Sequence, residues 1–340
     1  MTLPKILAIV TVLLFGAIGI AAIVKNKKAA PKTEIAAKVP NKESADQIKK
    51  IVPPPPPPAP KKPVAAPKQI ETPPYPYETS APFEKNHPEV DRIQEFFNKN
   101  EPKFPIVETV TYKSNVSWQK GRPAWLSDYA NYYQTSRHFI ARSLNGKPDY
   151  VKQDISEGDK FNVLRKDKNF EFYLLVDTSR CKMWFYYIDL DAKQKVLVKT
   201  YKLGLGRSDP SKTSGLLTPL GTYSLGDRVA IYKPKVSGVH QGNKTELITV
   251  FGTRWIPFEK ELGDTTASAK GFGIHGTPWK YDDVGVITDD QSSLGKYESD
   301  GCIRLSTQDI EELFSIIISR PTIIEIVRDL ANSKLSQYED

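Results

Sequence analysis

Two short strings near the C-terminus contain the residue types that cysteine acyl transfer requires. The string SDGCIRL holds a thiol, Cys302, with Gly301 before it and Arg304 two positions after it, and the upstream string GIHGT holds His275. A thiol with an ordinary pKa of about 8.5 is mostly protonated near neutrality, so a catalytic cysteine needs a base or a positive charge beside it. Gly301 leaves space for a substrate carbonyl, and Arg304 offers a planar fork to a carboxylate. The strings predict a cysteine nucleophile with a histidine base.

The two strings resemble the signature of the L,D-transpeptidase family, whose catalytic domain is also called the YkuD fold. Residues 172–189 resemble the opening strands of the family, and the strings GLG at 204–206 and TPLG at 218–221 resemble its turn before a central strand. The resemblance extends from about residue 170 to residue 327. It implies that Cys302 is the nucleophile and His275 the base, and that the oxyanion and the substrate are bound by the Cys302 backbone and by Gly301, Arg304, Ser299, Gly276 and Thr277.

The spacer between the two strings departs from the family pattern. Residues 278–298 form a longer stretch than the usual spacer, and it contains four acids without an assigned counterpart, Asp282, Asp283, Asp289 and Asp290. This difference concerns the lid over the site and the choice of substrate.

Several of these residues also have a structural interpretation. Cys302 is alternatively an inert buried thiol, and Arg304 alternatively braces the loop through a carboxylate of the protein. Ser299 either orients His275 or closes a turn. Asp309 is expected to be structural, because Ser306 three residues before it is close to a capping box and apolar residues then recur at helical spacing, at Ile310, Leu313, Phe314 and Ile317.

The other cysteine and histidines indicate no second reactive centre. Cys181 begins an alternating string, CKMWFYY, which predicts a strand and a packed thiol. A disulfide from Cys181 to Cys302 would consume the proposed nucleophile, and we do not expect it. His87, His138 and His240 lack metal-ligand spacing and are interpreted as surface or structural residues. The sequence therefore predicts no metal and no cofactor.

The first residues predict where this chemistry takes place. Residues 6–24 form an uncharged apolar run that, at about 1.5 Å per residue, can cross a hydrocarbon core of roughly 30 Å. We expect residues 1–28 to be a membrane anchor or uncleaved signal. A cleaved signal peptide is the alternative, but the run exceeds the apolar region of about 7–15 residues usual in such peptides.

The orientation of this segment involves two conflicting signals. The lysines at positions 25, 27 and 28 alone would leave the following chain in the cytoplasm. The substrate that the family resemblance implies, the peptide of the cell wall, lies outside. We therefore expect a single-pass protein of the inner membrane with its catalytic domain in the periplasm or cell-wall space.

Residues 29–85 form a linker rich in Lys, Ala and Pro, with uninterrupted proline at positions 53–58. Such a run extends as polyproline II, so we expect a spacer between membrane and enzyme, with a ligand for a proline-reading domain as the alternative. The net charge of +8 and the pI of about 9.1 suit a polyanionic neighbourhood such as the wall or lipid headgroups. Nucleic acid is not predicted as a partner, because no recognition motif accompanies the charge.

Residues 86–169 predict a small mixed α/β accessory region of unknown function. Apolar residues recur at helical spacing after Pro88, residues 138–151 predict a hairpin around the turn Asn145-Gly146, and residues 160–164 predict another strand. Aromatic residues cluster between positions 118 and 133. We interpret them as core residues, with a glycan-binding module as the alternative.

Residues 170–329 predict a mainly β catalytic domain, followed by a C-terminal tail at residues 330–340. Short alternating strings at 170–176, 183–187 and 196–200 are separated by Gly, Pro and Asp turns. This pattern is typical of a β-sandwich or open barrel, here an L,D-transpeptidase (YkuD-like) β-sandwich with a short helix packed on it.

The function implied by the resemblance is that of a peptidoglycan L,D-transpeptidase. Cys302 would form a thioester with a tetrapeptide stem, release D-alanine and transfer the acyl group to an amine, and a carbapenem would acylate the same sulfur. An L,D-carboxypeptidase that uses the same thioester and a non-catalytic peptidoglycan-binding tether are the alternatives. A papain-like protease fits poorly, because its local cysteine pattern is absent and its cysteine precedes its histidine.

Overall fold

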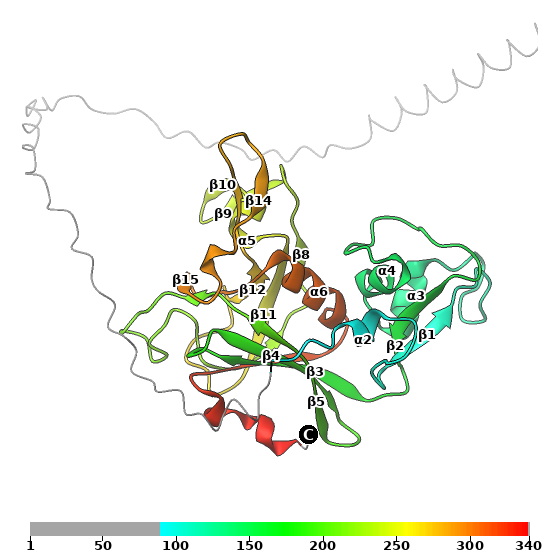
Figure 1. Cartoon of the computed structure of the whole chain (residues 1–340), viewed down its shortest axis with the longest axis horizontal. Helices are drawn as coiled ribbons and strands as arrows, with labels where there is room; N and C mark the ends of the chain where they lie inside the picture. The colour runs from blue at the N-terminus through cyan, green and yellow to red at the C-terminus, as the bar shows by residue number, and fades with distance from the viewer. Residues whose placement is uncertain (1–88, 339–340) are drawn as a thin grey trace, which may run out of the picture. The chain divides into compact units, whose positions relative to one another are not determined.

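The computed structural model of the protein describes residues 89–338 (Figure 1). The predicted membrane anchor at residues 1–28, the linker at residues 29–85 and His87 lie outside the described residues. Among the helices of residues 89–338, none combines the length and the apolar character needed to span a membrane.

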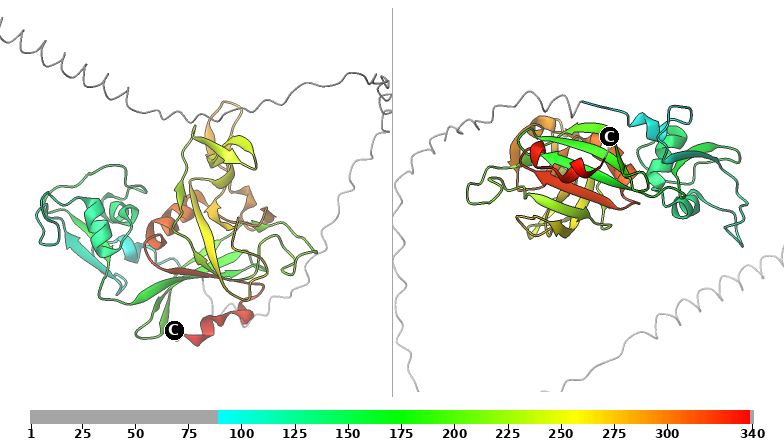
Figure 2. Two further views of the ribbon diagram at one scale, coloured as in Figure 1. Left: turned by 180° about the vertical axis from the view of Figure 1, so that it is seen from behind. Right: turned by 90° about the horizontal axis from the view of Figure 1, so that it is seen from below.

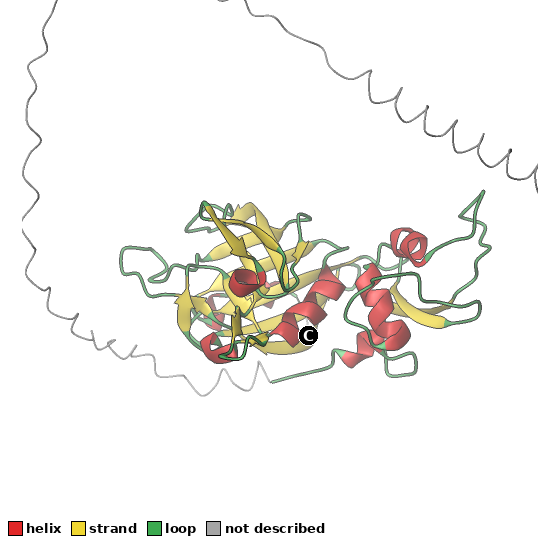
Figure 3. Cartoon of the chain, turned by 90° about the horizontal axis from the view of Figure 1, so that it is seen from above, coloured by secondary structure: helices red, strands yellow, loops and turns green. Residues whose placement is uncertain are grey.

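The accessory region is a small α/β unit, as the sequence predicts. A two-stranded antiparallel sheet pairs β1 (Val107–Thr111) with β2 (Lys160–Leu164), and three helices accompany it, α2 (Gln94–Phe97), α3 (Leu126–Tyr133) and α4 (Arg137–Asn145). Figure 3 shows these helices gathered at one side of the molecule. Most of the predicted aromatic cluster is internal, since Tyr129 packs with Phe161 and Trp118 against it. Trp125 and Tyr132 are the exceptions, with 55% and 36% of their surfaces exposed.

The hairpin predicted at residues 138–151 is wrong, because residues 137–145 form the helix α4. Its N-cap, Ser136, accepts a hydrogen bond from the His138 N–H, and Phe139 and Ile140 are buried. Gly146 ends the helix in the left-handed conformation, with φ of 76°, and donates its N–H to the Arg142 carbonyl. The dipeptide Asn145-Gly146 favours both hairpin turns and helix C-caps. Here it ends a helix, and the predicted hairpin turn is not formed.

The predicted catalytic domain is built on one mixed sheet of nine strands. The strand order is β16-β12-β11-β7-β17-β3-β4-β5, and β8 pairs with β11. The pairs β12–β16 and β17–β3 are parallel and the others are antiparallel. The strands are β3 (Phe170–Asp177), β4 (Lys182–Asp189), β5 (Gln194–Lys202), β7 (Gly221–Leu225), β8 (Ala230–Ile231), β11 (Arg254–Gly263), β12 (Gly273–Gly276), β16 (Ile303–Leu305) and β17 (Thr322–Val327).

The domain is mainly β with a short helix, as predicted, but its strands form one curled mixed sheet where the sequence predicts a β-sandwich. The helix α6 (Thr307–Ile317) joins β16 to β17, so the chain passes from the edge of the sheet to its middle through a helix. Buried residues of α6 share one core with residues of β3, β4, β11 and β12, and the sheet is seen to curl around the helix in Figure 2. The buried residues of α6 include Glu312 and Ser315 as well as its apolar side chains, so the helix is covered on most sides, which a flat two-layer sandwich does not provide.

The predicted start of α6 is confirmed. The Ser306 hydroxyl accepts the Asp309 N–H at 3.1 Å and donates to the Asp309 carboxylate at 2.7 Å. Ile310, Leu313 and Phe314 are buried, as their helical spacing predicts. This cap fixes the helix directly after the strand that follows Cys302.

Smaller elements cover the end of the sheet that carries the predicted site. Two hairpins, β9 (Ser237–His240) with β10 (Asn243–Glu246) and β13 (Trp279–Tyr281) with β14 (Ile287–Asp289), stand together at the top of Figure 1. The short helix α5 (Ile248–Phe251) lies beneath them, and a two-stranded parallel pair joins β6 (Leu205–Gly206) to β15 (Tyr297–Ser299). Short 3-10 turns occupy Gln291–Ser293, Leu330–Asn332 and Lys334–Gln337.

A buried ion pair ties the accessory region to the catalytic domain. Arg254 of β11, only 2% exposed, lies 2.6 Å from the Asp149 carboxylate and 3.5 Å from Glu311 of α6. A charge pair removed from water must be well compensated, because loss of either partner leaves an uncompensated charge in the interior. The accessory region is thus fixed against the helix that follows the predicted site.

Candidate active site

The parallel pairing of β12 with β16 brings the two predicted strings together. His275 is the register partner of Arg304, and Ile274 is the partner of Ile303. Cys302, directly before β16, is therefore level with Gly273, two residues before His275. Alternate residues of a strand share a face, so this register favours the imidazole and the sulfur on the same face of neighbouring strands.

The His275 ring is buried and its tautomer is fixed by a backbone carbonyl. Nδ1 lies 2.7 Å from the Gly276 oxygen, and because a carbonyl can only accept, Nδ1 carries the proton. Nε2 is left with its lone pair. The rings of Phe251 and Trp255 lie 5.4 and 5.9 Å away. Burial lowers the His275 pKa to about 4; the Gly276 carbonyl opposes this shift and the Arg304 charge adds to it, so the imidazole is a neutral base near pH 7.

The Cys302 thiol is free, half-buried and protonated near neutrality. Burial raises its pKa to about 11, against the opposing effects of the Gly273 N–H and the Arg304 charge, and the Asp300 carboxylate raises it further. The thiol donates to the Gly271 carbonyl at 3.8 Å. Among the described residues no hydrogen bond joins the sulfur to the imidazole. The resting pair is thus a neutral thiol and a neutral imidazole, unlike a preformed thiolate and imidazolium.

The loop before the sulfur is held by Ser299 and requires glycine at position 301. The Ser299 hydroxyl donates to the Cys302 carbonyl at 2.6 Å and accepts the Gly301 N–H at 3.1 Å. Ser299 thereby closes the turn, and the structure gives it no contact with His275. Gly301 has φ of +118°, and a Cβ there would lie 2.5 Å from a ring carbon of Phe272. Because the Gly301 N–H is already bonded, the N–H groups of Asp300 and Cys302 are the backbone donors of this loop left without a partner within the described residues.

Arg304 is a half-buried guanidinium without an ion-pair partner among residues 89–338. Burial lowers its pKa, while the neighbouring Cys302 and Asp300 raise it, and its Nε is buried without a hydrogen bond. The alternative that a carboxylate of the protein holds Arg304 is therefore not observed. Its backbone exchanges hydrogen bonds with Gly204 at 2.8 and 2.9 Å, which places the predicted GLG string beside the strand of the nucleophile.

Residues 171–326 match the family model described as the L,D-transpeptidase catalytic domain, YkuD. This part of the chain is a YkuD domain. A search of curated proteins gives no match. The strings that carried the resemblance in the sequence lie inside the matched range.

Solved structures similar to the chain include Bd1075 of Bdellovibrio bacteriovorus, at 18% identity with a TM-score of 0.33, covering 49% of this chain and 51% of that one. The helical cell shape determining protein Pgp2 of Campylobacter jejuni is similar at 19% identity with a TM-score of 0.32, covering 47% and 49%. The L,D-transpeptidase of Xylanimonas cellulosilytica is similar at 15% identity with a TM-score of 0.25, covering 46% and 60%. The chain thus spans about half the length of the first two structures.

Two further residues of the YkuD domain predicted to bind substrate, Gly276 and Thr277, are buried. A Cβ on Gly276 would lie 3.2 Å from the Gly252 Cα, so the strand and the end of α5 approach closely there. Thr277 is fully buried, donates its N–H to the Leu305 carbonyl at 2.8 Å and donates its hydroxyl to Asp289. Both residues support the strand that carries His275.

Asp289 is the residue of this site that the sequence did not assign. Besides the Thr277 hydroxyl, its carboxylate accepts the Thr307 N–H at 3.1 Å, at the first turn of α6, and the Gln291 side-chain amide at 3.0 Å. The long spacer is therefore pinned to the His275 strand and to α6 at once. An acid is commonly found beside a helix N-terminus, so a carboxylate near Thr307 could have been expected. The sequence does not show that residue 289 lies close to residue 307 in the fold.

The other acids of the spacer have local roles. Asp282 accepts the N–H groups of Val284 and Val286 and so forms the turn of the β13–β14 hairpin. Asp290 pairs with Lys280, which lowers the Asp290 pKa to about 2. Asp283 is exposed at the tip. The longer spacer is thus a folded hairpin beside the site.

The remaining candidates agree with a structural interpretation. Cys181 is a buried free thiol, so the disulfide to Cys302 is not formed. It lies in the turn before β4 instead of in the strand, with φ of 49°. His138 is buried in α4, and the His240 ring packs edge-on against Phe251 at 5.1 Å. No cluster of His, Cys, Asp or Glu among the described residues could hold a metal ion.

Proposed function

We propose that the protein is a peptidoglycan L,D-transpeptidase in which Cys302 is the nucleophile and His275 the base. The observation that carries this proposal is the tautomer of His275: with the proton on Nδ1 held by the Gly276 carbonyl, Nε2 keeps the lone pair that can accept a proton. The YkuD match over residues 171–326 and the β12–β16 register, which favours the sulfur and the imidazole on one face, also support it.

The first half of the reaction forms a thioester. The Cys302 sulfur attacks the carbonyl of the third stem residue, an L-centre, as its proton passes to His275 Nε2. The oxyanion that develops accepts the Cys302 N–H, which is unbonded in the resting loop. The carbon–nitrogen bond to the terminal D-alanine then breaks, and the proton on Nε2 passes to the departing amine.

The second half transfers the acyl group. An amine of a neighbouring stem attacks the thioester carbonyl, and Nε2 accepts the proton that the amine loses. The carbon–sulfur bond breaks, the sulfur regains a proton from the imidazolium, and an amide cross-link leaves the site. The resting thiol and imidazole are both neutral. Each half of the reaction therefore ends with these two groups carrying no net charge.

Arg304 is assigned to a carboxylate of the donor stem. Arg304 lies two residues after Cys302, its charge acts on the thiol, and its guanidinium has no carboxylate partner among the described residues. A substrate carboxylate would compensate this half-buried charge and orient the scissile carbonyl at the same time.

The test is incubation of the full chain with disaccharide tetrapeptides and separation of the products by chromatography and mass spectrometry. Released D-alanine together with a cross-linked dimer is expected from the parent, and neither from Cys302→Ala or His275→Gln. Released D-alanine with only tripeptide as the second product would identify water as the acceptor. Equal product from Cys302→Ala and the parent would disprove the assignment of the nucleophile.

We further propose that the catalytic domain works outside the inner membrane, held there by residues 1–28 and spaced by residues 29–85. The apolar run and the proline tract of the sequence support this placement, as does a wall substrate. Protease added to intact spheroplasts should degrade the catalytic domain. Protection until the membrane is lysed would place the domain in the cytoplasm instead.

A further inference from the structure

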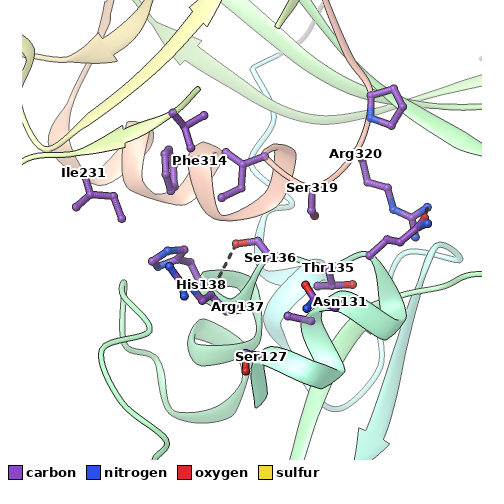
Figure 4. A pocket seen from close by; sticks show the side chains of 15 residues that line it. Ser127, Asn131, Thr135, Ser136, Arg137, His138, Ile231, Phe314, Ser319 and Arg320 are labelled. Carbon is purple, nitrogen blue, oxygen red and sulfur yellow. Dashed lines mark hydrogen bonds between the residues drawn. The ribbon is translucent and has the colours of Figure 1, made fainter. Parts of the chain in front are cut away.

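A second cavity among the described residues does not involve the residues around Cys302. It has a volume of about 1020 Å³ and lies between the helices of the accessory region and the C-terminal end of α6 (Figure 4). This volume is at the upper end of the range of about 300–1000 Å³ that is usual for small-molecule sites. A ligand there would touch both the accessory region and the YkuD domain.

The cavity wall contains arginine and no carboxylate. Arg137 and Arg320 line it, and none of its lining residues is Asp or Glu. Asp149, which lies 3.4 Å from His138 Nδ1, is already paired with Arg254 at 2.6 Å, and Asp227 lines an adjoining cavity that shares Arg320 with this one. The lining of the cavity itself therefore offers positive charge to a ligand and no carboxylate.

Arg320 is held in place by neutral oxygens alone. Its guanidinium donates to the Gln134 side chain at 3.2 Å and to the carbonyls of Tyr133 and Arg165 at 3.3 and 3.1 Å, and it lies over the Phe170 ring. Within the described residues it has no ion pair. Burial lowers its pKa, with no carboxylate opposing the shift. A half-buried charge fixed in this way is one that an anionic ligand can compensate.

The N-terminus of α4 adds to the positive character of the wall. Ser136, Arg137 and His138, the N-cap and first two residues of this nine-residue helix, all line the cavity. The positive end of the helix dipole favours an anion at this position. Arg137 is exposed on the helix, and its guanidinium also lies 5.7 Å from the ring centroid of Tyr150.

The rest of the lining suits a peptide. Phe314, Ile231 and Ile318 supply apolar surface, and the amides of Asn131 and Gln134 can both donate to and accept from a peptide backbone. Figure 4 shows Phe314 and Ile231 on one side of the cavity, and Asn131, Thr135 and Arg320 away from them. Apolar surface for side chains thus lies apart from a cationic edge for a carboxylate.

We propose that this cavity binds a carboxylate-bearing peptide, a second stem of the wall polymer distinct from the donor at Cys302. The choice of a wall stem rests on the proposed function, since the wall supplies the acidic peptide that such an enzyme meets. The cavity would hold a neighbouring strand on the accessory region while the YkuD domain acts on the donor.

The test measures protection of arginine in the full chain carrying Cys302→Ala. Phenylglyoxal labels exposed guanidinium groups, and peptide mapping by mass spectrometry reports each arginine separately. At ten times its Kd, a stem tetrapeptide should lower labelling of Arg137 roughly tenfold. Arg122, an exposed arginine of the same region that pairs with Asp128 and does not line the cavity, is the internal control and should not change.

Three comparison arms make the result decisive. The same tetrapeptide with amidated carboxylates should give no protection of Arg137, and Arg137→Gln should weaken tetrapeptide binding roughly tenfold, while Arg122→Gln should not. Equal protection by inorganic phosphate would show a general anion site and overturn the peptide assignment. Unchanged labelling of Arg137 with saturating tetrapeptide would overturn the site itself.

Failure of this inference is distinguishable from failure of the proposed function. If the parent forms cross-linked product but tetrapeptide does not protect Arg137, only the second site is wrong. If tetrapeptide protects Arg137 but Cys302 is never acylated, only the proposed catalysis is wrong.

Discussion

The resting Cys302 thiol should react slowly with small alkylating agents, and removal of His275 should not change this. Burial holds the thiol pKa at about 11, against about 8.5 to 9 for an ordinary cysteine. A difference of about two pH units leaves roughly one hundredth of the thiolate of an ordinary cysteine at pH 7.4. Since the thiolate is the species that alkylates, the rate at Cys302 should be roughly 100-fold below that of an exposed cysteine.

The groups that set this pKa identify the perturbations to make. The imidazole, with a pKa of about 4, carries no charge near neutrality, so His275→Gln should leave the alkylation midpoint within about half a pH unit. Arg304→Gln removes a charge that lowers the thiol pKa and should raise the midpoint, while Asp300→Asn should lower it. Transfer activity in His275→Gln should nevertheless fall by roughly a thousandfold, because the general base is lost.

The assay is iodoacetamide alkylation across pH 6 to 11, quantified by mass spectrometry on the peptide that contains Cys302. The buried Cys181, measured in the same digest, reports any opening of the fold. A parent midpoint below about pH 8 that rises on His275→Gln would show a preformed thiolate–imidazolium pair and refute the neutral pair described here.

Three further predictions concern stability. Between pH 6.5 and 4 the unfolded chain binds a proton at His275 that the folded chain does not, so the free energy of unfolding should fall by about 3 kcal/mol as the pH drops through this window. Urea denaturation should show this loss in the parent and a flatter curve in His275→Gln; identical curves would mean that the buried imidazole accepts its proton without cost. Gly301→Ala should lose about 1–3 kcal/mol of stability and most transfer activity, because its Cβ would meet Phe272. The control Gly158→Ala, with φ of +90° and open space around it, should lose less stability and keep activity. A comparable loss of stability in both variants would exclude the clash as the cause. Asp289→Ala should cost about 1–3 kcal/mol in thermal unfolding by releasing a buried hydroxyl and a helix N–H, and Asp283→Ala on the same hairpin should be silent.

The strands and the last helix could be predicted because their signals are local. The alternation in β3 and β4 and the Ser306 cap with its helical spacing each lie within one element. The curl of the sheet could not be predicted, because it depends on how much of α6 must be covered and on a crossover from β16 to β17. Long-range pairing of that kind leaves no periodic trace in either strand.

The helix α4 shows how a local signal can also mislead. Asn145-Gly146 suits a hairpin turn and a helix C-cap equally well, and the choice depends on Phe139 and Ile140 packing inward on one helical face. Phe139 and Ile140 are also residue types that favour strands. Tertiary packing overrode that preference.

The site was predictable in its residue types but not in its electrostatics. Cys302, His275 and Arg304 could be singled out from their sequence motifs. The tautomer of the imidazole and the neutral state of His275 and Cys302 depend on burial and on contacts with Gly276 and Gly273, which the motifs do not show. Asp289 was missed for the same reason, because its partners lie 12 and 18 residues away.

Intact-protein mass spectrometry after brief exposure to a tetrapeptide donor shows whether Cys302 becomes acylated. We expect the parent to gain the mass of the stem less D-alanine, the added mass to map to the peptide with Cys302, and the adduct to disappear when an acceptor amine is supplied. We expect no adduct on Cys302→Ala. An adduct on any other residue, or D-alanine release by Cys302→Ala at the rate of the parent, would contradict the mechanism.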